Sequence, residues 1–204
     1  MIQILSFLSM FIDHLGVVLF PDVDFLRLVG RLAFPLFAYS VGVGAVKTHD
    51  IDAYLYRVFG LAVVSQFVVF FILGEKLNVC FVLFGGLLFF RLFLNSEYYM
   101  MILCCIVFYI LPADYGFFGF CFVVSCCFAV YINQPIHFVV WFLICLLQSH
   151  FLVGMFFVGI IGLAVAWFVP FRRFNISKVF SYSFYPLHLI FLYVIGFTRD
   201  LFLN

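Results

Sequence analysis

Charge is scarce in this sequence. Of the 204 residues only 9% are Asp, Glu, Lys or Arg, against about a quarter in soluble proteins, and 68% are hydrophobic. The formal net charge of +1 creates no basic or acidic surface field of the kind that attracts nucleic acid. The composition therefore excludes a soluble domain and a nucleic-acid partner, and it predicts an integral membrane protein.

The cysteines also lack the spacing of metal-binding motifs. The seven cysteines include the neighbours Cys104-Cys105 and Cys126-Cys127, but they form no C-x-x-C pair and have no His at a ligand-like spacing. We expect these residues to behave as small apolar side chains, and we predict no metal site. The N-terminal run has no basic region and no small-residue cleavage site, so we expect a retained first span and not a removed signal peptide.

Apolar segments of about 15 to 20 residues fill the chain, and such lengths cross a hydrocarbon core of about 30 Å at 1.5 Å per residue. The connections are short and contain Pro, Gly, Asn and Asp, which leaves no room for a soluble domain. We therefore predict an all-α, polytopic helix bundle of eight to nine transmembrane spans that forms a single domain over residues 1–204. The predicted spans are 2–20, 26–46, 55–73, 78–94, 98–111, 115–132, 135–149, 151–169 and 177–197.

The orientation follows from the Lys and Arg residues of the connections. One set holds Lys47, Arg57, Arg91, Arg172, Arg173 and Lys178, and the opposite set holds Arg27, Lys76 and Arg199. Because cytoplasmic connections carry the excess of positive charge, we predict a cytoplasmic N-terminus, and nine spans then place the C-terminus outside.

Several ionisable residues interrupt the apolar runs. Asp13 and His14 lie in the first span and Arg31 in the second, where a charge near the bilayer centre costs about 3 kcal/mol or more without a partner. Asp13 and His14 point about 100° apart on a helix, so we expect Asp13 to pair with an Arg of the second span and His14 to face an open site. The pair either locks two helices together or belongs to a functional site.

The predicted orientation adds Asp114 and His188 to the same outer half of the membrane. His188 shares a helix face with Tyr185 and Ser181, and it is either a core imidazole bonded to a backbone carbonyl or a functional group. On the cytoplasmic side, the basic stretch 171–178 reflects ordinary topology or forms a docking patch for a polyphosphate such as coenzyme A.

A family resemblance joins these motifs. Taken in order, they are Ile12-Asp13-His14, Gly30-Arg31-x-Ala33-Phe34-Pro35-x-Phe37, Asn78, Asp114-Tyr115-Gly116 and Phe184-Tyr185-Pro186-x-His188-Leu189. As an ordered set over nearly the whole chain, they resemble the TraX family of membrane proteins. The resemblance implies an acetyltransferase of the bacterial inner membrane that N-acetylates the amino terminus of conjugative pilin. A more distant resemblance is to the heparan-α-glucosaminide N-acetyltransferase group, which uses cytoplasmic acetyl-CoA.

The resemblance also implies roles for single residues around a central polar cavity. His14 would be the catalytic base, since its pKa of about 6.5 suits deprotonation of an amine, and Arg31 would stabilise the oxyanion. The remaining implied roles are orientation of His14 or the acceptor by Asp114 and His188, and acceptor binding by Tyr185 and Asn78. Asp13 belongs to the same catalytic set as the partner of an Arg of the second span, and the candidate acetyl-CoA contacts are Arg172, Arg173 and Lys178. The acceptor would be a pilin or another envelope molecule such as a glycan. The same polar residues also suit a proton-coupled transporter or a non-catalytic pilus-assembly factor.

Overall fold

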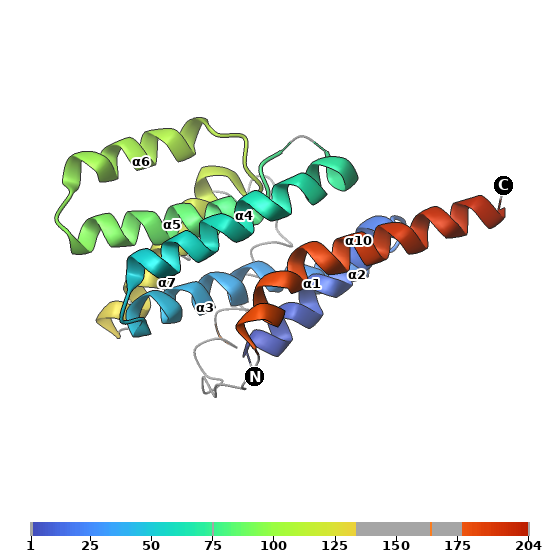
Figure 1. The fold of residues 1–204 in the computed structure, drawn as a ribbon, viewed down its shortest axis with the longest axis horizontal. Coiled ribbons are helices and arrows are strands. Elements are labelled where there is room, and N and C mark those ends of the chain that lie inside the picture. The colour runs from blue at the N-terminus through green and yellow to red at the C-terminus, as the bar shows by residue number, and fades with distance from the viewer. Residues whose placement is uncertain (1, 75, 134–163, 165–176, 204) are drawn as a thin grey trace. The chain divides into compact units, whose positions relative to one another are not determined.

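A computed structural model describes residues 2–74, 76–133, 164 and 177–203, and in this part of the chain the secondary structure is helical (Figure 1). The only β-type pairing among these residues is one isolated bridge between Leu77 and Ala113. The all-α prediction is confirmed. The predicted spans 135–149 and 151–169 lie outside the described residues, apart from residue 164.

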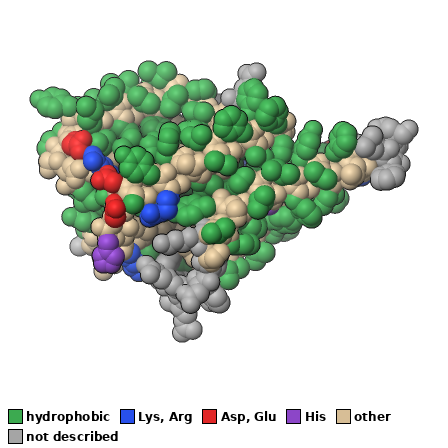
Figure 2. Space-filling view, viewed as in Figure 1, with side chains coloured by type: hydrophobic (Ala, Val, Ile, Leu, Met, Phe, Trp, Pro, Cys, Tyr) green, Lys and Arg blue, Asp and Glu red, His purple; other side chains and the backbone are tan. Residues whose placement is uncertain are grey.

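Among the described residues, three helical segments are long and apolar enough to cross a membrane, namely Asp24–Lys47, Ile51–Ile72 and Val179–Arg199. The helices Ile2–Val18, Val79–Leu94, Tyr98–Ile110 and Gly116–Ile132 are apolar but shorter. Hydrophobic side chains cover most of the face drawn in Figure 2, as the surface of a membrane protein requires because lipid tails replace water there. The structure thus agrees with the predicted membrane protein.

The chain divides into two compact units. The first comprises Met1–Phe37, Phe67–Gly74 and Val153–Asn204, and the second comprises Ala38–Gln66 and Glu75–Leu152. The expectation of a single domain over residues 1–204 stays a prediction.

The first unit is built on α1 (Ile2–Val18), which packs against α2 (Asp24–Gly30) and α10 (Lys178–Leu203) (Figure 1). The predicted span 26–46 corresponds to the candidate span Asp24–Lys47, which is divided into α2, ending at Gly30, and α3 (Ala33–Lys47), beginning after a two-residue turn. Pro35 explains the break: a proline ring clashes with the carbonyl four residues earlier, here that of Arg31, and has no N–H to donate to it.

The second unit contains α4 (Ile51–Leu73) as far as Gln66, together with α5 (Val79–Leu94), α6 (Tyr98–Ile110) and α7 (Gly116–Ile132). Helices α5, α6 and α7 pack against one another. Their close approach depends on small residues of α5. A Cβ atom on Gly86 would lie 2.4 Å from Cγ1 of Val123, so only glycine lets α7 come this near.

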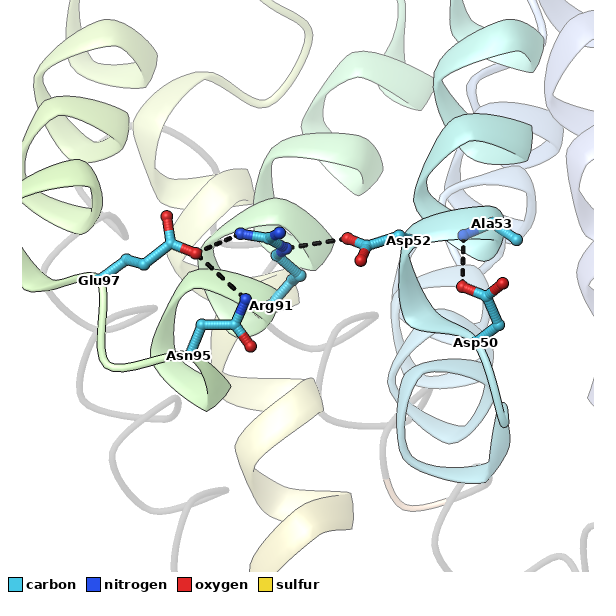
Figure 3. Close-up of polar contacts among 6 residues, drawn as sticks. All are labelled: Asp50, Asp52, Ala53, Arg91, Asn95 and Glu97. Atoms are coloured by element: carbon cyan, nitrogen blue, oxygen red, sulfur yellow. Dashed lines mark hydrogen bonds and ion pairs between the residues drawn. The ribbon is translucent and has the colours of Figure 1, made fainter.

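A charged cluster joins the beginning of α4 to the turn between α5 and α6 (Figure 3). Arg91 Nε donates to Asp52 Oδ1 at 2.9 Å, and its Nη1 donates to Glu97. Asp50 caps α4 by accepting from the backbone N–H of Ala53 at 2.8 Å. The Asp52 side chain is 54% exposed, so solvent screens its ion pair and the cluster contributes little stability, about 1 kcal/mol or less per pair.

Candidate functional site

His14 of α1 and His188 of α10 meet in the first unit. Nδ1 of His14 lies 2.8 Å from Nε2 of His188, and both residues are buried, at 9% and 5% exposure. The two residues are 174 positions apart in the sequence, so only the packing of α1 against α10 brings them together. The result is a hydrogen-bonded pair of ionisable rings in an apolar surrounding.

The direction of this hydrogen bond follows from the backbone. Nδ1 of His188 lies 2.7 Å from the carbonyl oxygen of Phe184, which can only accept, so this Nδ1 carries the proton. In neutral His188 the lone pair is then on Nε2, which accepts from Nδ1–H of His14. His14 therefore has its own lone pair on Nε2, at the side of the ring away from His188. The hydrogen bond to His188 thus fixes the tautomer of the His14 ring and leaves its Nε2 as the basic nitrogen.

Aromatic side chains fix both imidazole rings. The Phe184 ring stacks on His188 with a centroid distance of 5.0 Å and an interplanar angle of 12°. The Tyr185 ring lies 5.9 Å from the His14 ring and 5.7 Å from the His188 ring, and Tyr185 is 6% exposed. The structure thus places Tyr185, a predicted acceptor contact, beside both histidines.

An apolar groove with a volume of about 300 Å³ opens next to His188. All of its lining comes from α1 and α10 and consists, besides His188, of Phe11, Phe180, Ser183, Phe184, Leu187 and Phe191. His188 and Ser183 are its polar members. The groove therefore gives the histidine pair one side that suits an apolar group.

The backbone of helix α2 comes very close to α1 near Asp13 and Gly16. A Cβ atom on Gly30 would lie only 2.3 Å from Cα of Asp13, and one on Gly16 would lie 3.0 Å from Cβ of Leu26. Ser9 strengthens the crossing, since its hydroxyl donates to the carbonyls of Val29, at 2.7 Å, and Gly30, at 3.0 Å. These contacts set the position of α2 against α1.

Asp13 has an interaction in the structure, and its predicted pairing with an Arg of the second span stays a prediction. Near Asp13 the two helices touch through the backbone of Gly30. The arginine that comes within electrostatic reach of His14 is Arg27, one turn before Arg31. For the oxyanion role the sequence analysis selected Arg31.

Two predicted site residues belong to the second unit. Asn78 is fully buried and caps α5: its Oδ1 accepts from the Cys80 N–H at 2.9 Å, and its Nδ2 donates to the Ala62 carbonyl at 3.0 Å. The predicted acceptor contact of Asn78 stays a prediction. Asp114 is half-buried in the turn between α6 and α7, where burial raises the pKa of its carboxyl against the opposing effect of Lys76.

The predicted acetyl-CoA contacts remain predictions. Arg172 and Arg173 lie outside the described residues. Lys178 is the first residue of α10, and its side chain is not among those described.

The apolar helices and the buried histidine pair define the chain as a helical membrane protein with a polar site inside one of its units. Its family follows from comparison with known sequences. The chain belongs to the TraX family, whose model, described as TraX protein, matches residues 1–196. The resemblance seen in the ordered motifs is thereby confirmed.

A curated relative adds little. The uncharacterized protein RP591 of Rickettsia prowazekii (strain Madrid E) is 36% identical over 42 residues, which are 21% of this chain and 17% of that protein. The chain thus matches less than a fifth of this relative's length. No solved structure matches.

Proposed function

We propose that this protein is an integral-membrane acetyltransferase that moves the acetyl group of acetyl-CoA to an acceptor amine, most simply the N-terminal amine of a pilin. The observation that carries the proposal is the His14–His188 pair, because it leaves a lone pair on His14 Nε2. A buried imidazole with a fixed tautomer is suited to general-base catalysis. Membership of the TraX family supports the choice of acceptor.

The proposed reaction uses His14 twice. The acceptor nitrogen attacks the thioester carbon while His14 Nε2 takes the proton that the amine loses. The tetrahedral intermediate then breaks its C–S bond, and the coenzyme A thiolate takes the proton back from His14. His188 holds the His14 ring in place and, as the acceptor of the Nδ1–H bond, stabilises the imidazolium between the two steps.

The proposal includes a location. The protein would be a multi-pass component of the bacterial inner membrane, with about nine spans, a cytoplasmic N-terminus and a central polar cavity that acetyl-CoA enters from the cytoplasm. The distribution of Lys and Arg supports this orientation. A glycan of the cell envelope is the alternative acceptor.

The test is transfer of labelled acetyl from acetyl-CoA to a pilin-like peptide with a free N-terminal amine, using the purified protein in detergent. We expect His14→Ala to fold and to lower the rate by about two to four orders of magnitude, the usual contribution of a general base. His49→Ala is the matched control, because His49 is exposed between α3 and α4 and should leave the rate unchanged. Wild-type transfer by a folded His14→Ala variant would exclude His14 from the reaction. Absence of transfer to peptide and glycan acceptors by the wild type would favour a proton-coupled transporter that uses the same histidine pair.

A further inference from the structure

We propose that α6 faces lipid directly and that the bilayer beside it is thinned to about 20 Å, where an average hydrocarbon core measures about 30 Å. The inference concerns a surface of the second unit and the partner of that surface, the acyl chains of the surrounding lipid. It does not depend on the proposed acetyl transfer. It is carried by the exposure of α6, by its length, and by the polar residues at both of its ends.

Helix α6 is the exposed member of the group that it forms with α5 and α7. Of its 13 residues Cys104 and Phe108 are buried, whereas α5 has eight buried residues and α7 has seven. The other apolar side chains of α6 are between 41% and 72% exposed, namely Met100, Ile102, Leu103, Ile106, Val107 and Ile110. In a chain of this composition such a face meets lipid, because water would leave a large apolar patch unsatisfied.

The exposed face is too short for an average bilayer. The 13 residues of α6 measure about 20 Å along the helix, and any tilt shortens the crossing further. Helix α5 agrees, because the apolar residues 79–90 between its cap Asn78 and Arg91 measure about 18 Å. Both lengths fall about 10 Å short of the average hydrocarbon core.

Charged residues mark the end of α5 and the beginning of α6. Arg91 Nε donates to Asp52 at 2.9 Å, and its Nη1 donates to Glu97, the residue before α6 (Figure 3). At the opposite ends of the two helices, the N–H of Asp114 donates to the carbonyl of Leu77 at 2.9 Å, which joins the turn after α6 to the turn before α5. A charge inside hydrocarbon is costly, so both sets of turns must lie at water.

Tyrosine side chains lie near the same two boundaries. Tyr98 and Tyr99 begin α6 with 61% and 90% exposure, and Tyr109 near its end is 74% exposed. Tyrosine prefers the boundary between lipid and water, yet Tyr99 and Tyr109 are separated by only about 15 Å along the helix. Boundary residues at both ends favour lipid, and not a second copy of the chain, as the partner of this face.

The lipid beside α6 must therefore shorten, and lipids with short chains do so at the lowest cost in free energy. Helix α4 provides an internal comparison, because its 23 residues measure about 35 Å and need no thinning. Leu103 near the middle of α6 and Val64 near the middle of α4 are 52% and 58% exposed, so they offer matched positions for a reporter.

The experiment measures which lipid lies next to each helix. Leu103→Trp and Val64→Trp are placed separately in vesicles of equal amounts of two phosphatidylcholines, with chains of about 14 and about 22 carbons, and either lipid carries bromine as a quencher. The fluorescence of the wild type, with its two native Trp residues, is subtracted. We expect the brominated short-chain lipid to quench Leu103→Trp about twofold or more above the brominated long-chain lipid, and we expect no such preference for Val64→Trp.

The other outcomes overturn the inference. Equal quenching of Leu103→Trp by the two lipids, or stronger quenching by the long-chain lipid, would show that the bilayer is not thinned at α6. The same short-chain preference at Val64→Trp would make the effect a property of the whole protein and not of α6. Absence of quenching at Leu103→Trp by either lipid would show that protein, such as a second copy, covers this face. If Leu103→Trp does not fold, Ile106→Trp on the same helix, with 50% exposure, decides the matter by the same criteria.

Discussion

Gly30 is a residue at which a single added methyl group should strongly destabilise the fold. In Gly30→Ala the new Cβ would lie 2.3 Å from Cα and from Cβ of Asp13 and 2.6 Å from its backbone N. Two of these three atoms belong to the backbone of α1, so no side-chain rotation relieves the contact. Helix α2 must move away from α1 by roughly 1 Å or more to restore ordinary carbon–carbon separations of about 3.5 Å.

The expected loss of stability in Gly30→Ala follows from the cost of overpacking. Insertion of a methyl group into a well-packed region costs about 1–3 kcal/mol, and a clash with backbone belongs at the upper end. For a chain of this size each kcal/mol shifts the melting temperature by about 2–4 °C, so we expect Gly30→Ala to melt about 6–12 °C below the wild type.

The assay is thermal unfolding of the purified protein in detergent, with Gly60→Ala as the control. Gly60 is an exposed residue inside α4, and a Cβ atom there would meet nothing within 4 Å. Because alanine is the better helix former by about 1 kcal/mol, this variant should melt at or slightly above the wild-type temperature. Equal melting temperatures for Gly30→Ala and the wild type would refute the close crossing of α1 and α2.

Two predictions concern the second unit. Asn78→Ala removes the cap of α5 and leaves the Ala62 carbonyl without its donor, so we expect a loss of about 2 kcal/mol in the free energy of unfolding with little change in the KM for the peptide. An unchanged melting temperature with a raised KM would instead support the predicted acceptor contact. Burial raises the pKa of Asp114 above 3.8, so the protonated carboxyl is favoured in the folded state, and its contribution to stability is lost as pH rises from about 3.8 through the raised value. Asp114→Asn should therefore gain stability relative to the wild type between about pH 4 and pH 7, and a difference in melting temperature that is independent of pH would contradict this.

The sequence alone was sufficient to predict the class of protein and most helix bounds. Low charge and long apolar runs are local properties, and so are the Pro, Gly and Asn residues that end helices, so α1, α4, α5, α6 and α7 lie close to their predicted ranges. The ordered motifs also identified the family. The break between α2 and α3 was predictable too, because Pro35 acts on the carbonyl four residues before it.

Only the tertiary structure decided which polar residues meet. Helical periodicity gives the direction of a side chain but not its partner, since the partner depends on where two helices cross and at what distance. The crossing of α1 and α2, for example, depends on the close approach that Gly30 and Gly16 allow. The His14–His188 hydrogen bond joins the two ends of the chain for the same reason: it depends on the packing of α1 against α10, which no local pattern encodes.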